Sequence, residues 1–160
     1  MELPSTIEFV IPGTPHPWRA PQVVTLKNGQ RIAHKEKAEL QWKDTVRAEA
    51  RAAGVKYQDD GPMGTYVLVV YPRPRSWPKK TRLTREPKIT RPDSDNILKG
   101  IQDALQGIAC RDDGQFYSSH IGRVWGEPGE SAHVLVRIVY GPLWPIPQPS
   151  GIEKDANRPF

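Results

Sequence analysis

Proline is the residue that most constrains how this chain can fold, because 17 of the 160 residues are proline. Average usage is about 5%, and proline breaks the interior of helices and of central strands. The chain is therefore not expected to form a bundle of long helices. We expect one compact domain with long, stiff connections, large enough to bury a core without disulfides or a structural metal.

The composition excludes several protein classes. A single cysteine, Cys110, rules out an intramolecular disulfide and a cysteine-based zinc site. The longest apolar run, at 66–70, has the length of a strand and falls well short of the roughly 18 residues that a membrane span needs. The first residues lack the basic and apolar regions of a secretory signal. We therefore expect a cytoplasmic protein without membrane contact.

Local patterns predict an α+β fold, a small mixed β-sheet with two principal helices in the order β-α-β-α-β-β. Helices are expected at about 35–53 and 93–107, where apolar residues recur at helical spacing. We place the domain at residues 1–141 and a proline-rich tail at 142–160. The expected strands are 7–11, 65–71, 120–125 and 133–140, with a hairpin loop at 127–130 between the last two and a short hairpin around the turn at 28–29.

The excess positive charge lies in one segment, residues 73–91. The whole chain has a formal net charge of +5, and this segment alone contains eight bases and one acid, Glu86. Its prolines disfavour a helix, so we expect an extended arm whose natural partner is a polyanion such as nucleic acid. The alternative is a solvated surface loop. The candidate DNA-binding residues are Arg73, Arg75, Lys79, Lys80, Arg82, Arg85, Lys88 and Arg91.

Acidic residues at the start of the second helix indicate a site. Asp95 and Lys99 are neighbours on the side of this helix opposite its apolar stripe, and Asp93 stands where the helix begins. If the chain folds back after the helix, Asp113 comes close to Asp93 and Asp95. The alternative is that Asp93 is an N-cap, Asp95 a first-turn acid favoured by the helix dipole, and Asp112-Asp113-Gly114 an ordinary turn.

A functional cluster of these acids would need a cation. Three carboxylates within ~5 Å repel by roughly 3 kcal/mol per pair at an effective dielectric of ~20. Ligands that are all oxygen suit Mg²⁺ or Mn²⁺, and Lys99 would neutralise phosphate charge or orient a nucleophile. A basic arm beside such a site is what an enzyme that cuts phosphodiesters needs, because the acids alone repel DNA.

The run Asp93-Ser94-Asp95-Asn96, followed by Lys99, Asp103-Ala104-Leu105 and Asp112-Asp113-Gly114-Gln115, resembles the core motif of RusA-type Holliday junction resolvases. The resemblance covers about residues 6–140. It implies that Asp93, Asp95 and Asp113 are the catalytic, metal-binding acids, with Asp112 as a substitute ligand and Lys99 as the essential lysine. It also implies a homodimer that uses Mg²⁺ or Mn²⁺ to make paired nicks in four-way DNA junctions, in recombination and repair.

Two other functions fit the residues. One is a non-catalytic DNA-binding or regulatory protein that keeps the fold, in which the acids are caps and turns. The other is a general metal nuclease without preference for branched DNA. An ATP-driven activity is not expected, because the sequence has no glycine-rich phosphate loop.

Overall fold

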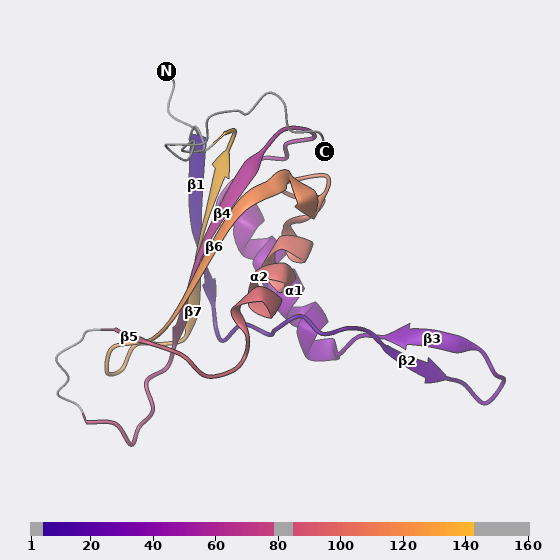
Figure 1. The fold of residues 1–160 in the computed structure, drawn as a ribbon, viewed down its shortest axis with the longest axis horizontal. Coiled ribbons are helices and arrows are strands. Elements are labelled where there is room, and N and C mark those ends of the chain that lie inside the picture. Colours follow the sequence, from indigo (N-terminus) through magenta and orange to yellow (C-terminus); the bar gives the residue numbers. More distant parts are fainter. Residues whose placement is uncertain (1–4, 79–84, 143–160) are drawn as a thin grey trace, which may run out of the picture.

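The computed structural model describes residues 5–78 and 85–142. They form a five-stranded mixed sheet with two helices on one face, and a separate two-stranded hairpin (Figure 1). The predicted α+β single domain is confirmed. Of the tail predicted at 142–160, residues 143–160 lie outside the described residues. The elements in chain order are β1 (Ser5–Pro12), β2 (Gln22–Thr25), β3 (Arg31–His34), α1 (Lys37–Ala52), β4 (Met63–Tyr71), β5 (Glu86–Pro87), α2 (Ser94–Leu105), the 3₁₀ turn η1 (Asp113–Gln115), β6 (Phe116–Trp125) and β7 (His133–Tyr140).

Strand β4 lies at the centre of the sheet, whose strand order is β1-β7-β4-β6-β5. It pairs in parallel with β6 on one edge and antiparallel with β7 on the other. Every residue of β4 except Tyr66 and Leu68 is buried. This burial explains the nearly continuous apolar run in the sequence, since a central strand has little contact with water.

The predicted hairpin between β6 and β7 is wrong, because these two strands flank β4 instead of pairing with each other. The connecting loop crosses the end of β4, where the backbone N–H of Gly126 donates to the carbonyl of Tyr71 at 2.8 Å. The apolar β4 needs a partner on both edges, and β6 and β7 supply them. Strand β6 also begins at Phe116, earlier than predicted, because it pairs along the full length of β4.

Helix α1 packs on the side of the sheet where β1 lies. Its predicted apolar face is confirmed for Trp42, Val46 and Ala50, which are all buried. Ala53 lies beyond the helix as its exposed C-cap, and Gly54 ends the helix with a φ of +78° that favours glycine. Neither α1 nor α2 is long and apolar enough to cross a membrane, nor is any other helix in the described part of the chain.

Helix α2 packs beside α1 on the part of the sheet where β6 lies. Its predicted stripe is confirmed: Ile97, Ile101 and Leu105 are fully buried, and the burial of each contributes about 2 kcal/mol. Polar contacts fix the middle of the helix as well, because Nε2 of Gln102 donates to the hydroxyl of Ser119 in β6 at 2.8 Å. The outer face of α2 is thereby held in one orientation.

The hairpin of β2 and β3 was predicted from the turn at Asn28 and Gly29, and it is confirmed. Gly29 has a φ of +82°, and the side chain of Asn28 accepts the backbone N–H of Gln30 at 3.0 Å. The hairpin projects away from the sheet and both helices (Figure 1). It is a local unit whose strands are stabilised mainly by each other.

Cys110 gives a direct test of the packing at the end of α2. Its side chain is fully buried, and burial, followed by the nearby Asp113 and Asp112 carboxylates, raises the pKa of the thiol to about 11. We expect no reaction of the folded protein with a thiol reagent at pH 8, and full reaction of one thiol in urea. Reaction of the folded protein at the rate of the unfolded chain would contradict this packing.

The same pKa predicts how stability depends on pH. The unfolded thiol titrates near pH 8.5, below the folded value of about 11. Between these values the folded state keeps a proton that the unfolded state loses, so stability falls as the pH rises through this window. Urea unfolding at pH 8 and pH 10.5 should show this loss, and Cys110→Ala should reduce it.

Candidate active site

Asp93 and Asp95 lie at the N-terminal end of α2, and both are exposed. Asp93 occupies the N-cap position with extended backbone, but its side chain accepts no capping hydrogen bond. Neither carboxylate forms a hydrogen bond or an ion pair with another residue in the described ranges. Asp93 therefore does not act as a side-chain cap. Asp95 does lie in the first turn, where the helix dipole favours an acid, and both carboxylates are exposed and available for a ligand.

Lys88 fixes the loop that leads into Asp93 by hydrogen bonds to oxygens of this loop. The Lys88 ammonium is buried and donates to the carbonyl and hydroxyl of Thr90, at 2.9 and 2.8 Å, and to the carbonyl of Arg91. It also lies over the rings of Tyr71 and Trp125, at 4.7 and 5.1 Å from their centroids. Burial lowers the pKa of Lys88, and the positive charge of Arg123 lowers it further.

Arg123 of β6 fixes the same loop from the sheet. Its guanidinium donates to the carbonyls of Thr90 and Pro92, the second of which directly precedes Asp93. Its own carbonyl accepts the backbone N–H of Lys88 at 2.9 Å. Two cations thus bind backbone oxygens on the approach to α2, and they set the position from which the Asp93 side chain extends.

Lys99 lies one turn after Asp95 and has two contacts on the protein surface. Its ammonium is 3.9 Å from an oxygen of Asp103 and 5.1 Å from the ring centroid of Trp18. The loop that carries Trp18 is tied to the helix, since its backbone N–H donates to the carbonyl of Asn96 at 2.9 Å. The ammonium remains half-exposed and can reach a ligand.

A chain of charges connects Lys99 to the interior between the helices. Asp103 binds the ammonium of Lys43 at 3.3 Å, and Lys43 lies 3.5 Å from the carboxylate of Glu39. Glu39 is only 2% exposed and also contacts Lys35 at 3.2 Å. Buried charges of this kind require partners, so each carboxylate here lies between two ammonium groups.

Asp112 and Asp113 lie beyond the other end of α2. Asp112 is the N-cap of η1, and its carboxylate accepts the backbone N–H of Gly114 at 2.8 Å. Gln115 completes a capping box with Asp112. The alternative prediction, that Asp112 belongs to an ordinary turn, therefore holds for this residue. The carboxylate of Asp113 has no such partner among the described residues, which favours Asp113 over Asp112 as a ligand.

One chain does not bring the three predicted ligands together. Asp93 and Asp95 precede or begin a helix of twelve residues, which is about 18 Å long, and Asp113 follows its far end. The side chain of Gln106, just after α2, donates to the carbonyl of Arg111 and holds the turn there. Across residues 5–78 and 85–142, no three His, Cys, Asp or Glu side chains are grouped in a way that could hold a metal ion.

The basic segment differs from the expected arm of free charges. The side chain of Arg73 is only 6% exposed and pairs with Glu86 at 2.6 Å, and Arg85 pairs with Glu130 at 2.5 Å. Lys88 is buried beneath the loop before α2. These three bases are therefore engaged within the domain. Arg73 and Arg85 pair with acids elsewhere in the sequence, and Lys88 binds the nearby carbonyls of Thr90 and Arg91.

The other five candidate bases fall into two groups. Two of them are exposed and three lie outside the described ranges. The exposed ones are Arg75 and Arg91. The remaining three are Lys79, Lys80 and Arg82.

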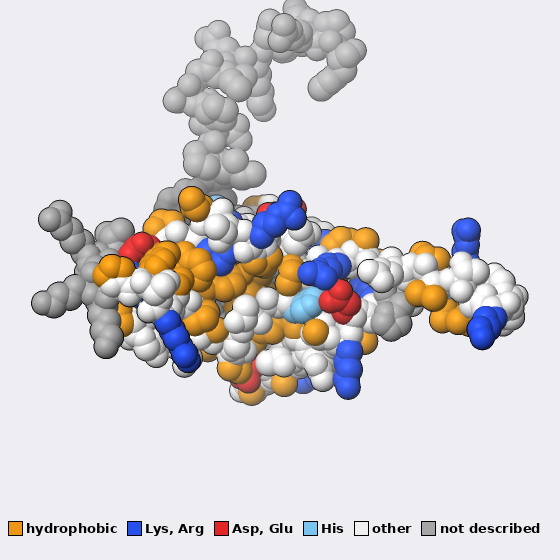
Figure 2. Space-filling view, turned by 90° about the horizontal axis from the view of Figure 1, so that it is seen from below, with side chains coloured by type: hydrophobic (Ala, Val, Ile, Leu, Met, Phe, Trp, Pro, Cys, Tyr) orange, Lys and Arg blue, Asp and Glu red, His pale blue; other side chains and the backbone are white. Residues whose placement is uncertain are grey.

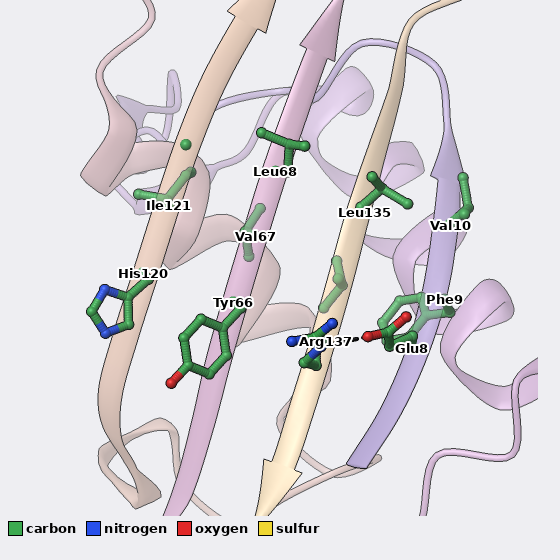
Figure 3. A pocket seen from close by; sticks show the side chains of 12 residues that line it. Glu8, Phe9, Val10, Tyr66, Val67, Leu68, His120, Ile121, Leu135 and Arg137 are labelled. Carbon is green, nitrogen blue, oxygen red and sulfur yellow. Dashed lines mark hydrogen bonds and ion pairs between the residues drawn. The ribbon is translucent and has the colours of Figure 1, made fainter. Parts of the chain in front are cut away.

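A pocket of about 550 Å³ lies on the face of the sheet opposite the helices (Figure 3). Its lining includes Tyr66 and His120, whose rings stack at 5.0 Å, and the ion pair of Glu8 with Arg137. None of the predicted site residues lines it. The pocket and the acids of α2 are therefore separate features on opposite sides of the sheet.

Sequence reasoning missed the side chains that surround Lys99. Trp18 lies in a proline-rich loop, where no periodic pattern indicates its direction. Lys43 and Glu39 stand on α1 at a spacing of four residues, which is as typical of a solvated helix face as of a buried pair. Only the packing of α1 against α2 distinguishes these cases.

A comparison with protein families identifies one match. The family model described as endodeoxyribonuclease RusA matches residues 12–138 of the 160-residue chain. The matched range contains both helices, the hairpin and η1, and with them the four predicted site acids, Asp93, Asp95, Asp112 and Asp113. No curated protein matches the chain.

The charge network between the helices predicts a stability effect. Lys43→Met leaves Glu39 buried with Lys35 as its remaining partner, so we expect a loss of about 3 kcal/mol in the free energy of unfolding. Urea unfolding followed by tryptophan fluorescence measures it. The double variant Glu39→Leu/Lys43→Met should recover most of the loss. A cost below about 1 kcal/mol for Lys43→Met would show that the network is solvated.

Proposed function

The chain belongs to the RusA endodeoxyribonuclease family, and we propose that it is a structure-selective endodeoxyribonuclease. It would resolve Holliday junctions by Mg²⁺-dependent hydrolysis of phosphodiester bonds, with paired nicks, in DNA recombination and repair. The observation that carries the proposal is the extent of the family match, which includes α2 with its motif of acids and lysine. The free carboxylates of Asp93 and Asp95 support it.

The residues present fit a divalent cation. Mg²⁺ is usually bound by one or two carboxylates together with substrate phosphates, and Asp93 and Asp95 offer two carboxylates without partners among the described residues. When bound, such an ion polarises the phosphate and lowers the pKa of the attacking water. Mn²⁺ takes the same oxygen ligands.

The other residues of the site have roles that follow from their positions. Lys99 is oriented by Asp103 and Trp18, and its half-exposed ammonium would offset the negative charge that develops on the phosphate. Lys88 and Arg123 act on Asp93 through the backbone before it, so they are positioning residues.

Asp113 would complete the site from a second copy of the chain. Strand β6 pairs on its outer edge only with β5, at Val124 and Trp125, within the described residues. Its backbone at 118–122 is therefore an open edge, and open edges pair with other strands. Helix α2 lies over this part of β6, as the bond from Gln102 to Ser119 indicates.

Antiparallel pairing of two such edges about a twofold axis would place the two α2 helices side by side in opposite directions. The far end of one helix would then lie next to the start of the other. Asp113 of one copy would approach Asp93 and Asp95 of its partner. The open edge of β6 fits the homodimer that the family resemblance implies, and such a dimer would account for the separation of Asp93 and Asp95 from Asp113 within one chain.

Substitution of the acids tests the nuclease assignment. Asp93→Asn and Asp95→Asn should reduce Mg²⁺-dependent cleavage of a labelled four-way junction by at least about a hundredfold. Junction binding should persist, since each change removes negative charge. Asp112→Asn is the matched control and should keep activity, because an asparagine can still cap η1.

Assays of the unmodified protein distinguish the proposed function from the two alternatives, a non-catalytic DNA-binding protein and a general metal nuclease. If it shows no nicking in Mg²⁺ or Mn²⁺, the protein is a binding module. If it cuts linear duplex as well as a junction in competition, it is a general nuclease.

Mixed dimers test how the site is completed. Asp93→Asn and Asp113→Asn should each be inactive alone, but refolding the two together should restore nicking. In such a mixed dimer one site contains both substitutions and the other contains neither. Sites built within single chains would give two inactive sites and no restoration. Sedimentation of the unmodified protein should show a dimer.

A further inference from the structure

The β2–β3 hairpin exposes apolar side chains that no other part of the described chain covers. Val24 pairs with Ile32 across the two strands, and they are 44% and 42% exposed. Val23, on the opposite face of the hairpin, is 63% exposed. A two-stranded ribbon is only marginally stable in water, and apolar surface of this kind marks an interaction site.

The charge of the hairpin indicates the chemistry of its partner. From Thr14 to Lys35 the sequence contains Arg19, Lys27, Arg31 and Lys35 and no acid. Arg19 is paired with Glu36 at 2.8 Å. Lys27 and Arg31 have neither an ion pair nor a side-chain hydrogen bond within residues 5–78 and 85–142. Basic side chains lie at the tip of the hairpin and apolar ones along it (Figure 2). A polyanion with accessible apolar surface fits both features.

The hairpin also joins the rest of the domain next to the proposed catalytic residues. The loop that enters it carries Trp18, which is bonded to Asn96 of α2 and lies against the ammonium of Lys99. From Gln22 to the turn at Asn28 the ribbon is about 20 Å long. DNA bound at the acids of α2 would therefore come within reach of the hairpin.

We infer that the β2–β3 hairpin enters branched DNA at the branch point, beside the cleavage site. Val24 and Ile32 contact the faces of bases whose stacking is interrupted there, and Lys27 and Arg31 contact the flanking phosphates. Apolar side chains act on DNA in this way where base steps are opened, and a two-stranded ribbon has the width to enter a groove. The inference rests on the proposed function and adds the element that distinguishes branched from linear DNA.

The test separates apolar from charged contacts. The first variant is Val24→Thr/Ile32→Thr, which keeps β-branched residues and so preserves the strands. The second is Lys27→Gln/Arg31→Gln. The matched control, Arg51→Gln/Lys56→Gln, removes two exposed bases near the end of α1. Fluorescence anisotropy without divalent metal measures binding to a four-way junction and to a linear duplex, and 2-aminopurine at the branch point reports unstacking.

The expected results differ between the variants. The apolar variant should bind the junction about tenfold more weakly, a loss of about 1.4 kcal/mol, with unchanged binding to linear duplex and a smaller 2-aminopurine signal. The charge variant should bind both the junction and the linear duplex more weakly, and the slope of log K against log salt should be smaller by about 2. The control should bind like the parent, and all variants should melt like it, because the hairpin lies outside the core.

Three outcomes overturn the inference. If both hairpin variants bind the junction like the parent while the parent cleaves it, the hairpin inference fails and the proposed function stands. If the apolar variant sediments as a smaller species and loses affinity equally for both DNAs, the hairpin contacts a second copy of the chain. If the parent neither binds nor cuts a junction, the proposed function itself fails.

Discussion

The burial of one face of α2 against the sheet determines the rest of the site. Ile97, Ile101 and Leu105 are inaccessible to water, so the helix cannot rotate without exposing them. With that face fixed, Asp95 and Lys99 must point outward. The length of the same helix separates Asp93 from Asp113, so the core that orients the acids also keeps them apart within one chain.

Features that depend on local pattern could be predicted from the sequence, and features that depend on distant contacts could not. The stripe of α2, the run of β4 and the turn at Asn28 repeat over a few residues, and each specifies its own element. The strand order could not be predicted, because the loop from β6 to β7 has the composition of a hairpin turn whichever strands it joins. The separation of Asp93 from Asp113 follows from helix length and could have been predicted.

The charges of this chain illustrate the same limit. The sequence shows a concentration of bases at 73–91, but not that Glu86 and Glu130 neutralise two of them. Nor does it show that Lys88 is buried beneath a loop. Counting charges along the sequence does not show which of them pair with residues of other elements in the folded protein. In contrast, Lys27 and Arg31 are only two bases, but they lie at an exposed turn where no acid in the described part of the chain pairs with them.

The separation of the hairpin from the core has an evolutionary consequence. The first residue of β2, Gln22, pairs with the last residue of β3, His34. Residues can therefore be added or removed between these two positions without disturbing the five-stranded sheet or either helix. Selection can therefore change this ribbon in length and composition while the catalytic scaffold stays constant. Related chains would diverge fastest here, and a transplanted ribbon offers a route to new substrate preferences.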